Sequence, residues 1–329
     1  MSPDQTLSRL PIQVSPLNIV HDLPEVARVW NVALPCYPLP ADSLQKLLPK
    51  PNAHHLVARL DSEIVGFCLS YTAPRLSTTS GYLAVLAVDP QWQGQGVGST
   101  LVAETITWFR SEFPQGRVEL GSNAPRFFPG VPTDLPPNVL EFFAHRGFQI
   151  RPPVPRDVDL FQDVREYQAP EKYVAMAKQG RYTFGPLQPE HYAECLAGQK
   201  RNFSYNPTWV DMYHKLDPSA HPSCIMAAFD AEGKQVGWTL MLPPSSSFLQ
   251  ETWALPPLCG PNTGLIGCVG IDKDARGSGI GLALVSHAVE DLRERGAEGV
   301  FVDWVSMDGY YEKLGFKVWR SYRTGEIRP

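Results

Sequence analysis

Two copies of one ordered set of sequence patterns lie along this chain of 329 residues, and this repeat restricts the fold more than any other feature. Each copy runs from an alternating strand through a hairpin and an apolar strand to a glycine-rich loop, an amphipathic helix, a short strand and a helix that ends in Gly-Phe. The first copy has these elements at 12–18, 54–71, 81–90, 93–98, 99–113, 117–120 and 141–148, and the second at 182–188, 224–242, 264–273, 276–281, 282–296, 300–305 and 309–316. Such an ordered repeat predicts a tandem duplication of one α/β module.

The two copies also predict the domain organisation. We expect one domain at 1–164 and another at 181–329, joined by a polar linker at 165–180 that forms a short helix after Pro170. A hydrophobic share of 43% supplies enough apolar side chains for two cores. The first copy alone contains a proline-rich insert, at 125–137.

The composition excludes several classes of function. A net charge of -5 provides no basic surface for nucleic acid and favours a cationic substrate such as an amine. The cysteines form no CxxC pair and the histidines show no metal-ligand spacing, so we expect reduced thiols and no metal. The chain has no apolar run long enough for a membrane span and no signal-like start, so we expect a cytoplasmic protein without a membrane partner. The segment is also compatible with being a piece of a larger fusion protein.

The two glycine-rich loops are the candidate phosphate sites. Each lies between an apolar strand and a helix, where residues without a β-carbon allow backbone N–H groups to converge on a phosphate and the helix dipole adds attraction. Neither loop has the GK[ST] of a P-loop or the spacing of a dinucleotide fingerprint, which disfavours hydride transfer. The loop residues are Gln93, Gly94, Gln95, Gly96, Val97 and Gly98 in the first copy, and Arg276, Gly277, Ser278, Gly279, Ile280 and Gly281 in the second.

The order of these motifs resembles a known superfamily in both halves of the chain. A pattern [Gln/Arg]-x-x-Gly-x-Gly after a buried strand, followed by a helix, a short strand and Tyr-x-x-x-Gly-Phe, is similar to the GCN5-related N-acetyltransferase (GNAT) superfamily. The resemblance implies two tandem folds, each with a central mixed, mostly antiparallel sheet flanked by helices. It also implies acetyl-coenzyme A (acetyl-CoA) as cosubstrate, with its pyrophosphate on the loop and its pantetheine arm along the preceding strand. Those strand positions are Val269, Gly270 and Ile271 in the second half and Leu86, Ala87 and Val88 in the first.

Two side chains distinguish the second half as the catalytic one. Acetyl transfer needs a neutral amine, stabilisation of an oxyanion and a proton for the departing thiolate. The resemblance assigns the proton to Tyr311, whereas the first half has Phe143 at the same position and a phenyl ring has no proton to give. Asp303, a carboxylate in an apolar strand, is the candidate to anchor the amine or accept its proton, and Glu119 takes the equivalent place in the first half as a substrate contact. The alternatives are that Tyr311 only packs and that Asp303 forms a structural salt bridge.

Aromatic residues on the expected acceptor side favour a sugar, because flat rings can stack on sugar faces. Trp304 adjoins Asp303 and Trp238 is a second candidate contact, with core packing as the alternative for both. The segments 126–132, VDWV and 309–320 resemble glucosamine or glucosaminide N-acetyltransferases, including the region that some fungal proteins fuse to a glycoside hydrolase. We therefore expect a small amine as partner, an amino sugar first, then a polyamine or an aminoglycoside. A lysine acetyltransferase and a non-catalytic sensor of acetyl-CoA or an amino sugar are the rival functions.

Overall fold

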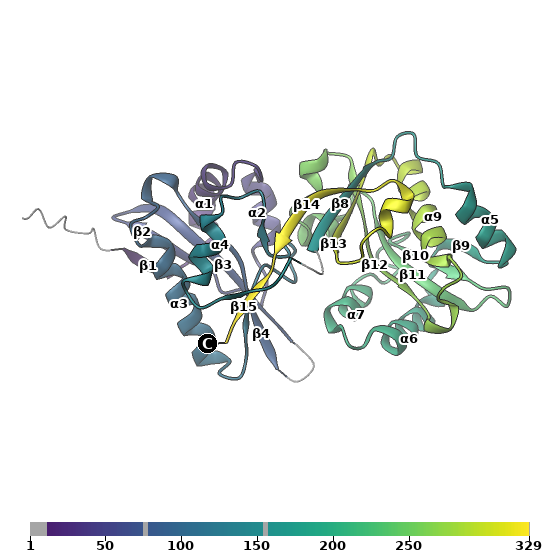
Figure 1. Ribbon diagram of the computed structural model, residues 1–329, viewed down its shortest axis with the longest axis horizontal. Helices are drawn as coiled ribbons and strands as arrows, with labels where there is room; N and C mark the ends of the chain where they lie inside the picture. The colour runs from purple at the N-terminus through teal and green to yellow at the C-terminus, as the bar shows by residue number, and fades with distance from the viewer. Residues whose placement is uncertain (1–11, 75–77, 154–156, 329) are drawn as a thin grey trace, which may run out of the picture.

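The computed structural model describes residues 12–74, 78–153 and 157–328. Two sheets lie side by side along the long axis of the molecule, one built mainly from the first half of the chain and one mainly from the second (Figure 1). Helices flank each sheet, so the predicted class of two mixed α/β modules is confirmed. Among the helices of these three ranges, none is both long and apolar enough to cross a membrane.

The first sheet has the order β1-β2-β3-β4-β5-β15-β7. Its strands are β1 (Gln13–Pro16), β2 (Leu56–Leu60), β3 (Glu63–Pro74), β4 (Thr79–Val88), β5 (Val118–Leu120), β7 (Gln149–Ile150) and β15 (Gly325–Ile327), and its helices are α1 (Ile19–Ala33), α2 (Ala41–Leu47), α3 (Val97–Glu112) and α4 (Asn138–Ala144). β2 and β3 form the predicted hairpin, which turns at Asp61 and Ser62. β4 and β5 are parallel, whereas the other neighbours are antiparallel.

The second sheet has the order β6-β14-β8-β13-β12-β11-β10-β9. Its strands are β6 (Val131–Pro132), β8 (Asp157–Asp163), β9 (Thr183–Pro186), β10 (Ile225–Phe229), β11 (Gln235–Leu242), β12 (Thr263–Ile271), β13 (Gly299–Val305) and β14 (Lys317–Arg323), and its helices are α5 (Glu171–Gln179), α6 (Tyr192–Phe203), α7 (Pro207–His214), α8 (Ser247–Thr252) and α9 (Ile280–Glu294). α5 begins after Pro170, as predicted for the linker. β10 and β11 form the second hairpin, and β12 is parallel to β13.

The same contacts hold the glycine-rich loop in both halves. Gln93 donates Nε2 to the carbonyl of Val88 at 3.0 Å, and Arg276 donates Nε to the carbonyl of Ile271 at 3.0 Å. An aspartate that caps the turn before each loop is ion-paired with an arginine of a helix, in the pairs Asp89–Arg28 and Asp272–Arg201. Equivalent contacts at equivalent positions are what a duplicated module predicts.

Three strands, β6, β8 and β15, cross between the halves. β8 precedes the linker but lies in the second sheet, between β13 and β14, and β15 at the end of the chain lies in the first sheet, between β5 and β7. The yellow C-terminal segment of Figure 1 therefore runs from one sheet into the other. The predicted limits of 1–164 and 181–329 therefore do not coincide with the two sheets. The residue pattern of a strand does not show which strand it pairs with.

The closing segments of the two halves differ. In the first half α4 is a helix, and Gly147 follows it with a φ of 88°. In the second half the predicted helix at 309–316 is wrong, since only a 3-10 turn, η5 (Tyr311–Leu314), forms there. Gly309 and Gly315 enclose this turn with φ values of 68° and 96°, and such left-handed residues cannot continue a helix.

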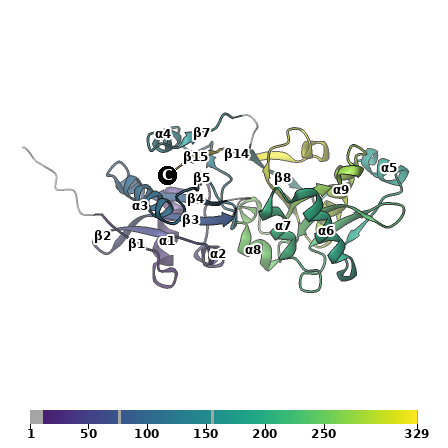
Figure 2. The ribbon, with the colours of Figure 1, turned by 90° about the horizontal axis from the view of Figure 1, so that it is seen from below.

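The two halves are joined by packing as well as by exchanged strands. α2 of the first half packs against α8 of the second (Figure 2), and Lys46 donates Nζ to Oε1 of Gln250 at 2.8 Å. β6, in the proline-rich insert, pairs with β14. One buried hydrophobic cluster includes both Trp30 and Trp253. The surfaces between the halves are thus part of the core.

Candidate functional site

The central strand of the second sheet opens towards its C-terminal end. β12 pairs with β13 from Thr263 to Ile266, and within the described chain this parallel ladder goes no further. On its other side, the register against β11 shifts. Gly267 and Gly270 are three residues apart, but the β11 residues that they face are only two apart. Cys268 adopts a φ of 49° within this bulge. The backbone from Cys268 onward is therefore splayed away from β13, as the resemblance implies for a pantetheine site.

Two buried hydroxyls hold this bulge. Tyr213 of α7 donates its hydroxyl to the carbonyl of Cys268 at 2.7 Å, and Thr239 donates Oγ1 to the carbonyl of Gly267 at 3.0 Å. Both side chains are fully buried. The sequence interpretation missed Tyr213, because a tyrosine in a short amphipathic helix looks like an ordinary core residue.

The second glycine-rich loop is shaped to receive a phosphate. Gly277 and Gly279 have φ values of 87° and 78°, and α9 begins at Ile280 directly after them. A β-carbon on Gly277 would meet no atom within 4 Å, whereas one on Gly279 would lie 2.3 Å from Cε of Met176 in α5. Glycines with left-handed φ directly before the positive end of α9 are a typical setting for a bound phosphate, and α5 borders this loop on one side.

The first loop has the same backbone but different neighbours. Gly94 and Gly96 have φ values of 74° and 95°, and a β-carbon on either would meet no atom within 4 Å. Beside Gly98 lies the ring of Phe142, whereas the hydroxyl of Tyr310 lies beside Gly281 in the second loop. The backbone of both loops is therefore suited to a pyrophosphate. The two loops differ in the side chains beside them.

A cavity of about 720 Å³, which we name the central cavity, lies between the two halves. Its walls include Glu119 and Arg126 from the first half and Cys268, Asp303 and Trp304 from the second. The structure therefore brings three of the predicted site residues, Glu119, Asp303 and Trp304, to one space beside the bulge of β12. Its volume lies within the roughly 300–1,000 Å³ that is typical of small-molecule sites.

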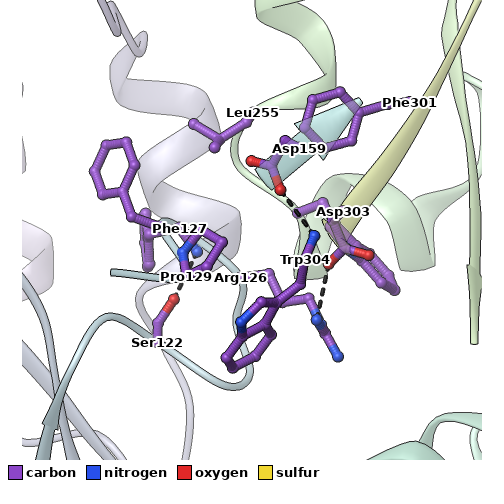
Figure 3. Close-up of a pocket in the computed structure, with 11 residues that line it drawn as sticks. Ser122, Arg126, Phe127, Pro129, Asp159, Leu255, Phe301, Asp303 and Trp304 are labelled. Carbon is purple, nitrogen blue, oxygen red and sulfur yellow. Dashed lines mark hydrogen bonds and ion pairs between the residues drawn. The ribbon is translucent and has the colours of Figure 1, made fainter. Parts of the chain in front are cut away.

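Asp303 is ion-paired across the two halves. Arg126, from the proline-rich insert, donates Nη1 to Oδ2 of Asp303 at 2.8 Å (Figure 3). Trp253 donates Nε1 to the same oxygen at 2.7 Å. The side chains of Arg126 and Asp303 are only 15% and 12% exposed. The guanidinium carbon of Arg126 lies 5.1 Å from the ring centre of Trp304 and 5.7 Å from that of Trp253. The salt bridge that the sequence left open is thus present, and it fixes the carboxylate at the edge of the central cavity.

A second carboxylate, Asp159 of β8, stands behind this pair. It accepts a hydrogen bond from the backbone N–H of Trp304 at 2.8 Å and another from the hydroxyl of Tyr322 at 2.6 Å. Burial raises the pKa of Asp159 to about 7, and the charge of Asp303 acts in the same direction. The small cavity of Figure 3, about 10 Å³, lies among these groups and is too small for a substrate.

Asp159 also supports an unusual backbone conformation. Trp304 has a φ of 53°, in the left-handed region, at a point where the register between β13 and β8 shifts. Residues other than glycine adopt this region at a cost, so the hydrogen bond that the N–H of Trp304 donates to Asp159 helps to hold Trp304 there. Sequence reasoning missed Asp159, although a carboxylate between the apolar residues Val158 and Leu160 was a usable signal.

Tyr311 is buried next to the bulge. It is 5% exposed and packs against Tyr310 and Phe316, with ring centres 5.0 and 6.1 Å away. Burial raises its pKa well above the ordinary range of a tyrosine, and the charges of Tyr310, Asp303 and Cys268 raise it further. Tyr311 therefore keeps its proton at neutral pH.

One predicted substrate contact, Trp238, and one predicted equivalence, that of Glu119 and Asp303, need correction. Trp238 is fully buried in β11 and donates Nε1 to Gln235 at 2.6 Å, so it is a core residue. Glu119 lines the central cavity but is not the counterpart of Asp303. In the first sheet Glu119 pairs with Tyr82, the residue after Gly81. The residue after Gly264 in the second sheet pairs with Phe301, so Phe301 is the counterpart of Glu119.

Known proteins agree with this architecture. A model of the acetyltransferase (GNAT) family matches residues 23–128 and 190–316. A fungal structure, described as a GCN5-related glucosamine N-acetyltransferase region in a multi-domain GH3 beta-N-acetylglucosaminidase, is 30% identical over 98% of this chain, with a TM-score of 0.89. This chain spans 39% of the length of that fungal chain.

Two less similar structures share the fold. A GCN5-related N-acetyltransferase from Sphaerobacter thermophilus is 17% identical over 97% of this chain and 96% of its own, with a TM-score of 0.70. A tandem GNAT protein from the clavulanic acid biosynthesis pathway is 15% identical over 96% of this chain and 98% of its own, with a TM-score of 0.62. No curated protein sequence matches the chain. With one family match in each half, the chain belongs to the GNAT family of acetyltransferases as a tandem member.

Proposed function

We propose that this acetyltransferase moves an acetyl group from acetyl-CoA to the amine of glucosamine or a glucosaminide in the central cavity. The observation that carries the proposal is the meeting of Asp303, Trp304 and the bulge at Cys268 on one wall of that cavity. A carboxylate beside an indole offers an ammonium partner and a flat face for a sugar ring. The likeness to the fungal glucosamine N-acetyltransferase region supports the same acceptor.

The second glycine-rich loop is the proposed site for the cosubstrate. The backbone of Arg276 to Gly281 would hold the pyrophosphate, and Val269, Gly270 and Ile271 would hold the pantetheine arm. When bound, acetyl-CoA supplies the acetyl group as a thioester. The first loop, Gln93 to Gly98, has a suitable backbone for a second molecule, but Phe143 stands where the second half has Tyr311.

Asp303 and Tyr311 divide the proton chemistry between them. Arg126 and Trp253 both bond to Oδ2 of Asp303, so Oδ1 is the oxygen we assign to the acceptor amine, which it anchors and from which it takes a proton. Tyr311 gives a proton to the thiolate of the departing coenzyme A. Tyr311 is protonated at neutral pH, so its hydroxyl has a proton to give.

The test is thiol release from acetyl-CoA with glucosamine, a linear polyamine and a lysine peptide as acceptors. We expect glucosamine to be the best of the three, and both Asp303→Asn and Tyr311→Phe to lower kcat by roughly 100-fold or more. Phe143→Tyr, at the matching position of the first half, is the control and leaves turnover unchanged.

Three other outcomes contradict the proposal. Turnover that survives both substitutions moves the active site out of the second half. A preference for the peptide indicates a lysine acetyltransferase. Binding of acetyl-CoA without thiol release for any acceptor indicates a sensor.

A further inference from the structure

A second cavity continues from the central cavity between the two halves. This distal cavity has a volume of about 890 Å³ and lies between the end of β3, the loop before β2, and helices α7 and α8. Four residues line both spaces: Pro74, Asn123, Pro207 and Thr208. The two cavities are therefore neighbouring parts of one cleft.

A hydrogen bond between the halves marks the point where the cavities meet. Asn123 of the first half donates Nδ2 to Oγ1 of Thr208 in α7 at 2.8 Å. Both residues line both cavities, so their bond stands at the boundary of the two spaces. It also fixes the distance between the halves at this point, because each side chain belongs to a different half.

The lining of the distal cavity suits a neutral, hydroxylated ring better than a strongly charged chain. Phe113 and Phe248 contribute flat apolar faces, and Asn52 is among its polar side chains. Asp211 is ion-paired with Lys215 at 2.6 Å, and Lys50 and Glu251 add one further charge of each sign, so the formal charges of the lining sum to zero. Flat rings beside neutral hydrogen-bonding groups are a common setting for sugars.

The size of the cleft exceeds what one sugar needs. The central cavity alone, at about 720 Å³, is large enough for a drug-sized ligand, and a single hexosamine is smaller than that. We infer that the acceptor is an oligosaccharide with a terminal glucosamine: the reacting unit lies in the central cavity beside Asp303, and the following sugar units occupy the distal cavity. This inference rests on the proposed amino-sugar acetyltransferase activity.

The experiment compares kcat/KM for glucosamine and for a β-linked trimer in which one terminal glucosamine is followed by two N-acetylglucosamine units, which carry no charge. In the unmodified protein we expect the trimer to exceed glucosamine by about tenfold or more, which corresponds to about 1.4 kcal/mol. Asp211→Trp and Ala73→Trp fill the distal cavity from opposite halves, and we expect each to lower the trimer value by about tenfold while glucosamine stays within about twofold.

Two controls separate bulk from charge. Asp211→Asn breaks the ion pair with Lys215 without filling the cavity, and His214→Trp adds the same bulk at an exposed position of α7 that lines neither cavity. Both are expected to keep the preference for the trimer.

The possible failures differ in what they overturn. Equal values for trimer and glucosamine in the unmodified protein, or a trimer value that neither tryptophan changes, overturns the oligosaccharide acceptor and leaves the proposed activity intact. A linear polyamine that exceeds the trimer and is lost with the same tryptophans overturns the sugar. Absence of thiol release with both sugars overturns the proposed function itself.

Discussion

Arg126 and Asp303 form an ion pair that joins the two halves of the chain, with Nη1 and Oδ2 2.8 Å apart. Arg126 comes from the proline-rich insert of the first half, and Asp303 comes from the bulged end of β13 in the second. Indole rings of Trp253 and Trp304 lie near the guanidinium, so the pair is shielded from water. The wall of the central cavity thus depends on both halves, although the proposed proton chemistry belongs to one.

This pair should show strong coupling in a double-mutant cycle. Removal of one partner leaves the other charge largely buried, so Arg126→Met and Asp303→Asn are each expected to destabilise the fold, and the two effects should differ from their sum by at least about 1 kcal/mol. Urea unfolding of the four proteins measures this. The exposed pair Arg165–Asp163 is the control, with an expected coupling below about 1 kcal/mol. Additive effects at Arg126 and Asp303 would show that the two side chains are not energetically coupled.

The two loops should differ in their effect on the cosubstrate. Gly277→Ala and Gly94→Ala place a methyl group at comparable left-handed positions, with φ values of 87° and 74°, and a β-carbon on either would meet no atom within 4 Å. The cost to the backbone is therefore similar, about 1–2 kcal/mol. Because catalysis is assigned to the second half, we expect Gly277→Ala to raise KM for acetyl-CoA by about tenfold and Gly94→Ala to change it by less than about twofold. The reverse order would place the working cosubstrate in the first half.

Loss of the Tyr213 hydroxyl should loosen the bulge of β12. Tyr213→Phe leaves the carbonyl of Cys268 without its 2.7 Å hydrogen bond, so we expect a loss of about 1–2 kcal/mol in the free energy of unfolding and a higher KM for acetyl-CoA. Tyr192→Phe is a matched control, because its hydroxyl bonds to the carbonyl of Tyr213 at 2.8 Å but does not reach the bulge. It should cost stability and leave KM unchanged. Equal KM values for both variants would mean that the bulge does not need Tyr213.

Asp159 should make the stability of the protein depend on pH. Burial raises its pKa to about 7, whereas an aspartate in an unfolded chain titrates near about 3.9. The folded state therefore holds this proton more tightly, and the contribution of Asp159 to the free energy of unfolding falls as the pH rises from about 4 to about 7.

Asp159→Asn tests this directly, because its amide can still accept from the N–H of Trp304 and can donate to Tyr322. We compare the urea midpoints of the variant and the unmodified protein at pH 5 and pH 8, which lie on either side of the pKa of about 7. The midpoint of the variant should be higher relative to that of the unmodified protein at pH 8 than at pH 5. A difference that stays constant across this range would mean that Asp159 is ionised throughout.

Local patterns in the sequence were sufficient for much of this protein. The two hairpins, the buried strands and the helices after each glycine-rich loop follow from periodicity and turn residues within short windows, and the duplication follows from their order. The difference between Tyr311 and Phe143 was also readable, because it is a difference of residue type at one position. The helix expected at 309–316 failed because Gly309 and Gly315, both in left-handed conformations, leave too few residues between them.

Only the tertiary structure decided which residues meet. Every residue of β11 is buried, so no alternation could reveal that Trp238 lies in the core. The partner of Asp303 is Arg126, 177 positions earlier in the chain. Asp159 contacts Trp304 because β8, a strand from the first half of the chain, lies beside β13 in the second sheet. Residue patterns report the period of a strand and the face it buries, but not its neighbour. Strand exchange and the ion pair between the halves are set by long-range packing, and they place the central cavity where the two modules touch.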